Sequence, residues 1–336
     1  MSEPNESPPA DRLPELLETE RVEETAACLD RLCAAETETR KRTLRAVRDV
    51  VAERPRTAED LVGPLSMFLT DDDRAVRLTT AKLFVSLAET EPAVALPAID
   101  PLADRLADDE EFYYVRARCA EALGYIGREH PEAVSDPAIL ADFRIGLSFD
   151  EAEVKEKLAK ALECVALGDP SRLRHQVESL AEHLVDDEVL VRYHLCTALT
   201  AVGCEHPAKL ASARDALVSR LTDEGEDPYV RGRAAEAVGL LRRVDGERVS
   251  SPDAIDIDDE DAAEFVAPRV AFLRDAREDT AGGDEKRAVG TLASLRSGTE
   301  AVVEAMTSPD GEACPYCGLE LPEAGPPMCP RCGAPR

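Results

Sequence analysis

The sequence has no tryptophan, and only 4% of its 336 residues are aromatic. Its apolar content comes mainly from alanine, leucine and valine. These small side chains favour slender helices that pack closely, rather than the thick core of a sandwich of two sheets. The length allows two ordinary domains or one elongated array.

Long apolar runs are also absent. No stretch approaches the roughly 20 consecutive apolar residues that a membrane-spanning helix requires. The N-terminal sequence MSEPNESPPA lacks the basic and apolar regions of a signal peptide. We therefore expect residues 1–10 to form a disordered tail, and we expect no membrane partner.

Lysine is scarce: only seven of the 40 basic residues are lysine, and the net charge is −29. Acid excess with few lysines resembles the proteins of halophilic archaea that accumulate salt, where acidity keeps a protein soluble. The alternative is an acidic surface that repels nucleic acid and attracts basic partners. Six of the ten cysteines are scattered through helical patterns, which indicates a reducing cytoplasm.

The main feature present is an internal repeat. YVRARCAEALG (114–124) recurs as YVRGRAAEAVG (229–239), and the intervening sequence contains more divergent copies of the same pattern. The copies align on a valine followed by a basic residue, at intervals of 37 to 39 residues: Val76, Val115, Val154, Val191 and Val230. An earlier unit has Thr39 at this Val position. We count six units over residues 11–245.

Each unit reads as two helices. Apolar residues after the Val position recur with helical spacing, and the fifth residue after each of the five valines is small, which permits close helix packing. A first helix ends in a leucine before this segment, and an acidic turn separates the two. An aspartate in that turn can cap the second helix. Stacked pairs of this kind form an all-α solenoid.

An Asp-containing turn followed by Val-Arg and Ala-x-x-Leu-Gly resembles the HEAT repeat, particularly the HEAT-like type of the phycobilin lyases. The resemblance covers about 280 of the 336 residues if residues 261–306 form a degenerate seventh helix pair after a linker at 246–260. It implies an α-solenoid of six to seven helix pairs. It does not extend to any catalytic residue of the lyases.

The HEAT resemblance also implies a ladder of hydrogen bonds between units. The turn aspartates that match it are Asp71 or Asp72, Asp108 or Asp109, Asp150, Asp186 or Asp187, and Asp223. The matching cations are Arg77, Arg116, Lys155, Arg192 and Arg231. Lys155 lacks the forked guanidinium and predicts a weaker rung. A row of arginines that binds a ligand is the alternative interpretation.

The second helices are basic within an acidic chain. Fourteen residues from each Val position together hold 18 basic and six acidic residues. Helix dipoles explain part of this surplus, because cations are favoured near helix C-termini. In HEAT solenoids the second helices line the concave side, so we predict a partner groove there for an acidic or helical protein segment. The residues expected to be exposed in it are Lys82, Arg118, Arg128, Lys157, Lys160, His194, Arg233 and Arg243.

The C-terminus carries a metal motif. CPYCGLELPEAGPPMCPRCG (314–333) places two C-x2-C turns eleven residues apart. It resembles the small zinc ribbons with paired CPxCG knuckles. Cys314, Cys317, Cys329 and Cys332 would then hold one structural Zn²⁺ with no open position for catalysis. The ribbon spans residues 314–336 after a linker at 307–313, and metal binding would supply its folding free energy.

Catalytic motifs are missing. We find no phosphate-binding loop, no nucleophile elbow and no H-E-x-x-H sequence. The sequence therefore predicts a non-enzymatic scaffold or adaptor for a protein partner, with the ribbon as a second docking module. A lyase-like or accessory enzyme subunit and a nucleic-acid-binding protein are the alternatives. No small-molecule substrate is evident.

The zinc motif makes a direct prediction. Metal analysis of the purified protein should give one Zn²⁺ per chain, because four thiolates complete a tetrahedral site. Metal-free protein in which Cys314 and Cys329 are freely alkylated would contradict the ribbon.

Overall fold

The computed structural model describes residues 9–19, 21–245, 260–274 and 288–307, and all regular elements in these ranges are helical. The α-helices are α1 (Pro9–Glu18), α2 (Val22–Cys33), α3 (Thr37–Glu53), α4 (Val62–Ser66), α5 (Arg74–Thr90), α6 (Pro92–Ala95), α7 (Ile99–Ala107), α8 (Tyr113–Glu129), α9 (Pro137–Ile145), α10 (Ala152–Gly168), α11 (Val177–Glu182), α12 (Val189–Glu205), α13 (Arg214–Thr222), α14 (Pro228–Asp245), α15 (Glu260–Arg274) and α16 (Leu292–Thr307). Short 3-10 helices cover Pro55–Leu61, Met67–Thr70, Leu96–Ala98, Gly146–Ser148, Pro170–Arg172, His183–Val185 and Pro207–Ala213.

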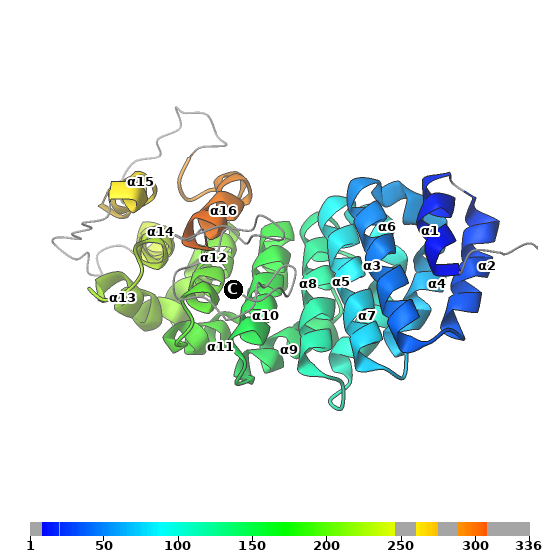
Figure 1. The fold of residues 1–336 in the computed structure, drawn as a ribbon. Helices are drawn as coiled ribbons and strands as arrows, with labels where there is room; N and C mark the ends of the chain where they lie inside the picture. Colours follow the sequence, from blue (N-terminus) through cyan, green and yellow to red (C-terminus); the bar gives the residue numbers. More distant parts are fainter. Residues whose placement is uncertain (1–8, 20, 246–259, 275–287, 308–336) are drawn as a thin grey trace, which may run out of the picture.

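The second helices of the six units form one continuous row. In chain order α3, α5, α8, α10, α12 and α14 each pack against the next, and they stand side by side in Figure 1. The first helix of each unit lies beside this row as one short helix or several short pieces. The predicted all-α repeat architecture, with stacked second helices, is therefore confirmed.

Proline explains why the two halves of a unit differ. The second helices α3, α5, α8, α10 and α12 are each 17 residues long with no internal proline. The following segment starts at a proline in several units, as at Pro92, Pro170 and Pro207. Further prolines such as Pro97 then break that segment into short pieces, because proline lacks the N–H that an α-helix needs in its interior.

The positions that define the repeat are core positions. All five valines at the Val position and all five small residues that follow them are fully buried. Helices α8 and α10 approach closely at Gly124, where an added Cβ would come within 2.7 Å of the Cα of Ala161. Each second helix thus buries its apolar surface mainly against its neighbours in the row.

Additional helices cover both ends of the row. At the start, α1 packs against α2 and α3, and its leucines Leu13, Leu16 and Leu17 are buried. Because α1 begins at Pro9, the tail predicted for residues 1–10 is wrong for its last two residues. At the other end, α15 packs along α14, as a further member of the row.

The predicted seventh helix pair over residues 261–306 is not formed. Whereas α15 continues the row, α16 leaves it and packs against α12 and α10 (Figure 1). Leu295 and Val302 of α16 are buried there. The helix therefore packs against α12 and α10 rather than against α15, which precedes it in the sequence. The linker segments 246–259 and 308–313 and the zinc ribbon at 314–336 lie outside the described residues.

The α8–α10 approach predicts opposite effects at two glycines. Gly124→Ala should lower the free energy of unfolding by about 1–3 kcal/mol, because the new methyl group meets backbone atoms of α10. Gly63→Ala meets no atom within 4 Å and should raise it by up to about 1 kcal/mol. Urea denaturation of both variants measures this, and equal effects would contradict the close approach.

Candidate functional site

Two rungs between units use an aspartate at the start of the next acidic turn. Nε and Nη2 of Arg40 lie 2.8 and 2.9 Å from the two carboxylate oxygens of Asp71. Lys155 Nζ donates to both carboxylate oxygens of Asp186, at 2.8 Å each. Lysine thus reaches the same acceptor as arginine, but through a single nitrogen.

Two other rungs are richer and use glutamate. Arg77 donates from Nε and Nη2 to both carboxylate oxygens of Glu111, at 2.7 and 2.8 Å, and its Nη1 reaches the carbonyl of Asp71. Arg192 binds Glu226 in the same forked way, at 2.8 and 2.6 Å. Both glutamates are almost completely buried. These guanidinium groups therefore bind the next unit and their own turn together.

The prediction that turn aspartates accept every rung is therefore wrong. Glu111 takes this role in place of Asp108 or Asp109, and Glu226 takes it in place of Asp223. Each glutamate lies just before its second helix and reaches the arginine of the preceding unit. No rung to Asp150 is present in the described part of the chain.

Two predicted rungs take a different form. Arg116 donates to the carbonyl of Leu106, lies 3.3 Å from Asp109 in its own unit, and stacks over the ring of Phe149 in the next. Arg231 donates to the carbonyl of Leu221 in the corresponding way.

The open edges of the second helices form one surface, here called the second-helix face. The eight predicted groove residues come from five successive second helices: Lys82 from α5, Arg118 and Arg128 from α8, Lys157 and Lys160 from α10, His194 from α12, and Arg233 and Arg243 from α14. Five of them are partly exposed and Arg243 is exposed. The expectation of exposure is wrong for the remaining two.

His194 and Arg233 are fully buried. Arg233 donates to Thr299 Oγ1 of α16 at 3.2 Å and to the Tyr193 hydroxyl at 3.3 Å. His194 Nδ1 lies 3.0 Å from a carboxylate oxygen of Glu163. The physical reason is α16, which packs over this end of the face and removes it from solvent.

In the middle of the face, the cations share one carboxylate. Glu121 lies 2.7 Å from Arg118 Nη1, 3.6 Å from Lys157 Nζ and 3.8 Å from Lys160 Nζ. Burial alone would raise the pKa of Glu121, but Lys157, Arg118 and Lys160 outweigh burial and lower it. Arg118 also binds Glu153 of α10. These cations are therefore largely neutralised inside the protein.

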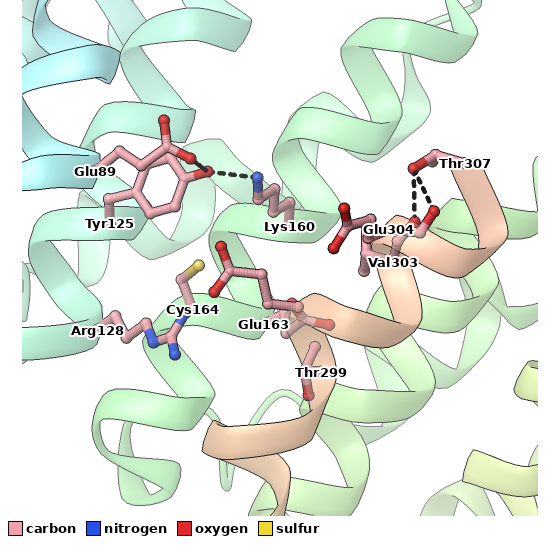
Figure 2. A pocket seen from close by; sticks show the side chains of 11 residues that line it. Glu89, Tyr125, Arg128, Lys160, Glu163, Cys164, Thr299, Val303, Glu304 and Thr307 are labelled. Atoms are coloured by element: carbon pink, nitrogen blue, oxygen red, sulfur yellow. Dashed lines mark hydrogen bonds between the residues drawn. The ribbon is translucent and has the colours of Figure 1, made fainter. Parts of the chain in front are cut away.

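A cavity of about 480 Å³ lies where the face meets α16. Figure 2 shows Glu163, Cys164 and Arg128 on one side, with Thr299 and Glu304 of α16 across from them. Next to it, Lys160 Nζ donates to the Tyr125 hydroxyl at 2.5 Å, and that hydroxyl donates to Glu89 at 3.1 Å. Burial and Glu89 raise the pKa of Tyr125.

The other end of the face carries further cations beside Arg118, of which Arg48 pairs with Asp49 at 3.0 Å. We call Arg45, Arg48, Lys82 and Arg118 the basic patch. Burial and Arg118 lower the pKa of Lys82, and Arg48 and Arg45 lower it further, against an opposing effect of Glu153. Within the described ranges, neither Arg45 nor Lys82 forms an ion pair or a hydrogen bond to a carboxylate.

The groove prediction omitted Arg45 and Arg48, although a signal for one of them was present. Arg45 stands six residues after Thr39, just as Lys82 stands six residues after Val76. Their alignment in the repeat could have placed them on the same stripe. Arg48 had no comparable counterpart among the predicted residues.

No group of three or more His, Cys, Asp or Glu residues in the described part of the chain is arranged to hold a metal ion. The four ribbon cysteines are outside that part. None of the helices described combines the length and apolarity needed to cross a membrane.

No family model matches this chain, and no curated protein matches its sequence. Two solved structures of engineered proteins resemble it: one has a TM-score of 0.54 at 21% identity and covers 64% of this chain and 98% of its own. The other has a TM-score of 0.51 at 19% identity and covers 90% of this chain and 85% of its own. A designed armadillo repeat protein has a TM-score of 0.48 at 17% identity over 68% of this chain and 99% of its own. At these identities the likeness concerns the helical repeat fold alone.

The rungs predict a measurable hierarchy. Arg77→Ala should lower the free energy of unfolding by about 2–4 kcal/mol, because it leaves the buried Glu111 carboxylate without its forked partner. Lys155→Ala removes fewer bonds and should cost about 1–2 kcal/mol. Denaturation of the two variants in parallel tests this order, and a larger loss for Lys155→Ala would contradict it.

Proposed function

We propose that the protein is a non-enzymatic interaction scaffold that binds an acidic segment of a protein partner along the second-helix face. The observation that carries the proposal is the basic patch. It lies on α3, α5 and α8, in the part of the second-helix face that α16 does not cover. Its cations lie together in a chain of net charge −29, and within the described ranges Arg45 and Lys82 have no carboxylate partner.

The electrostatics of Lys82 support a binding role. A half-buried lysine surrounded by three arginines costs free energy, and a bound carboxylate would relieve that cost. The rungs show how closely other cations of this protein are paired with acids. An acidic segment would complete the basic patch in the same way.

The partner would meet a chain that is mostly acidic. Repulsion from the rest of the surface opposes a highly acidic partner at low ionic strength, and salt screens that repulsion. We therefore propose a short acidic segment that contacts the patch directly. The acid excess itself is proposed to be an adaptation to high salt, as in halophilic archaea.

The C-terminal ribbon is proposed as a second docking module, with one Zn²⁺ on Cys314, Cys317, Cys329 and Cys332. The repeats are proposed to be of the HEAT-like type. The six described cysteines are free thiols, which supports action in a reducing cytoplasm.

Charge reversal at the patch tests the proposal. Arg45→Glu combined with Lys82→Glu should weaken binding of a fluorescein-labelled decaglutamate peptide about tenfold, because two attractions become repulsions. Fluorescence anisotropy measures the affinity, and circular dichroism checks that each variant stays helical.

The matched control is Arg174→Glu combined with Lys209→Glu, which makes the same charge change at exposed sites outside the second-helix face. Equal weakening by the control would show an effect of net charge and contradict the site. Tighter binding of an oligothymidylate than of the peptide, lost in the patch variant, would contradict a protein partner and favour nucleic acid.

A further inference from the structure

The last described helix occupies the second-helix face. After α15 continues the row, the chain returns, and α16 lies against α10 and α12. Figure 2 shows it opposite α8 and α10, across the cavity. Two stretches more than 120 residues apart in sequence thus meet here, as the bond from Arg296 to Leu167 shows.

Polar groups of the row bind the first turns of α16 specifically. Arg296 donates from Nε to the carbonyl of Leu167 at 2.6 Å and from Nη2 to that of Gly168 at 2.8 Å. These carbonyls end α10 and have no partner within their helix. Arg128 of α8 donates in turn to the Arg296 carbonyl at 3.1 Å. One arginine therefore sets the register of α16 on the row.

The surface beneath the middle of α16 is unusually polar for an interior. Arg233 and Glu236 are fully buried and 2.8 Å apart, and Arg269 of α15 lies 2.9 Å from the same carboxylate. Arg233 Nε and His194 Nε2 have no hydrogen-bond partner in the described part of the chain. Buried polar atoms normally find partners, so this surface has the character of a binding site rather than of a core.

The apolar anchorage of α16 is small. Only Leu295, Thr299 and Val302 of its sixteen residues are buried. The repeat helix α5 buries eight of its 17 residues, and α12 buries twelve. Elements with few buried apolar contacts open at lower free energy than the global fold.

We propose that the face of α10, α12 and α14 is a helix-binding site, that α16 is its intramolecular occupant, and that a partner helix of the same chemistry displaces α16. Such a helix carries an arginine, a threonine or serine three residues after it, and an aliphatic residue six residues after it, as in Arg296, Thr299 and Val302. These residues lie on one side of a helix. The site is separate from the basic patch, so either proposal can fail without the other.

Two native thiols report on this site. Cys164 lines the cavity beside α16 and is 3% exposed, and burial raises its pKa to about 12. Cys119 is fully buried in α8 among the repeats, away from the cavity lining, and burial raises its pKa as well. Opening of α16 should release Cys164 to iodoacetamide, whereas global unfolding releases both. Peptide-level mass spectrometry of the full-length chain separates the two rates.

Val302→Asp should accelerate alkylation of Cys164 about tenfold and leave that of Cys119 unchanged, because it places a charge under α16. Ala305→Asp makes the same change on the exposed side of α16 and should have no effect. Arg296→Glu should also accelerate Cys164, because it opposes the carbonyls of α10 without touching an apolar anchor.

A synthetic peptide of residues 290–307 should restore protection of Cys164 in the Val302→Asp protein, and the same peptide with Arg296→Glu should not. Unchanged alkylation of Cys164 in both full-length variants would overturn the displaceable helix. Parallel acceleration of Cys164 and Cys119 would also overturn it, by showing that α16 belongs to the core. Failure of the native peptide to protect would overturn the helix-binding site.

Discussion

The close packing of second helix against second helix is the constraint on which this structure depends. Each of these helices buries its Val position and its following small residue only when a neighbour stands on either side. At Gly124 the backbones of α8 and α10 approach so closely that no side chain fits between them. This spacing brings the cation of one unit within reach of the acidic turn of the next, and it leaves one edge of every helix open as a continuous face.

The rungs show a longer period than the single unit. An Arg–Asp or Lys–Asp rung is followed in the next unit by a forked Arg–Glu rung, and this order occurs twice, three units apart. Each glutamate of the forked rungs also has a second arginine nearby: Arg105 lies near Glu111, and Arg220 lies near Glu226. The two nearly identical phrases at 114–124 and 229–239 occupy the same place in these two blocks of three units.

Equivalent residues in the two blocks have nevertheless reached different environments. Arg118 and Arg233 each pair with the glutamate three residues later, at 2.7 and 2.8 Å. Arg118 remains at the edge of the basic patch, whereas Arg233 is enclosed by α15 and α16. One face thus carries two different surfaces: an open basic one at the first block and a covered polar one at the second.

The sequence by itself determined the helical repeat, the buried Val and small positions, and the cations that join the units, because these depend on local periodicity and on contacts between adjacent units. It also placed Lys82, Arg118 and Lys157 on one stripe. Only the tertiary structure decided which glutamates complete the rungs, because a shift of a few residues in a turn changes which carboxylate reaches the guanidinium. Only the tertiary structure decided that His194 and Arg233 are buried. The helix that covers them comes from a distant part of the chain, and its few apolar residues are compatible with many docking sites.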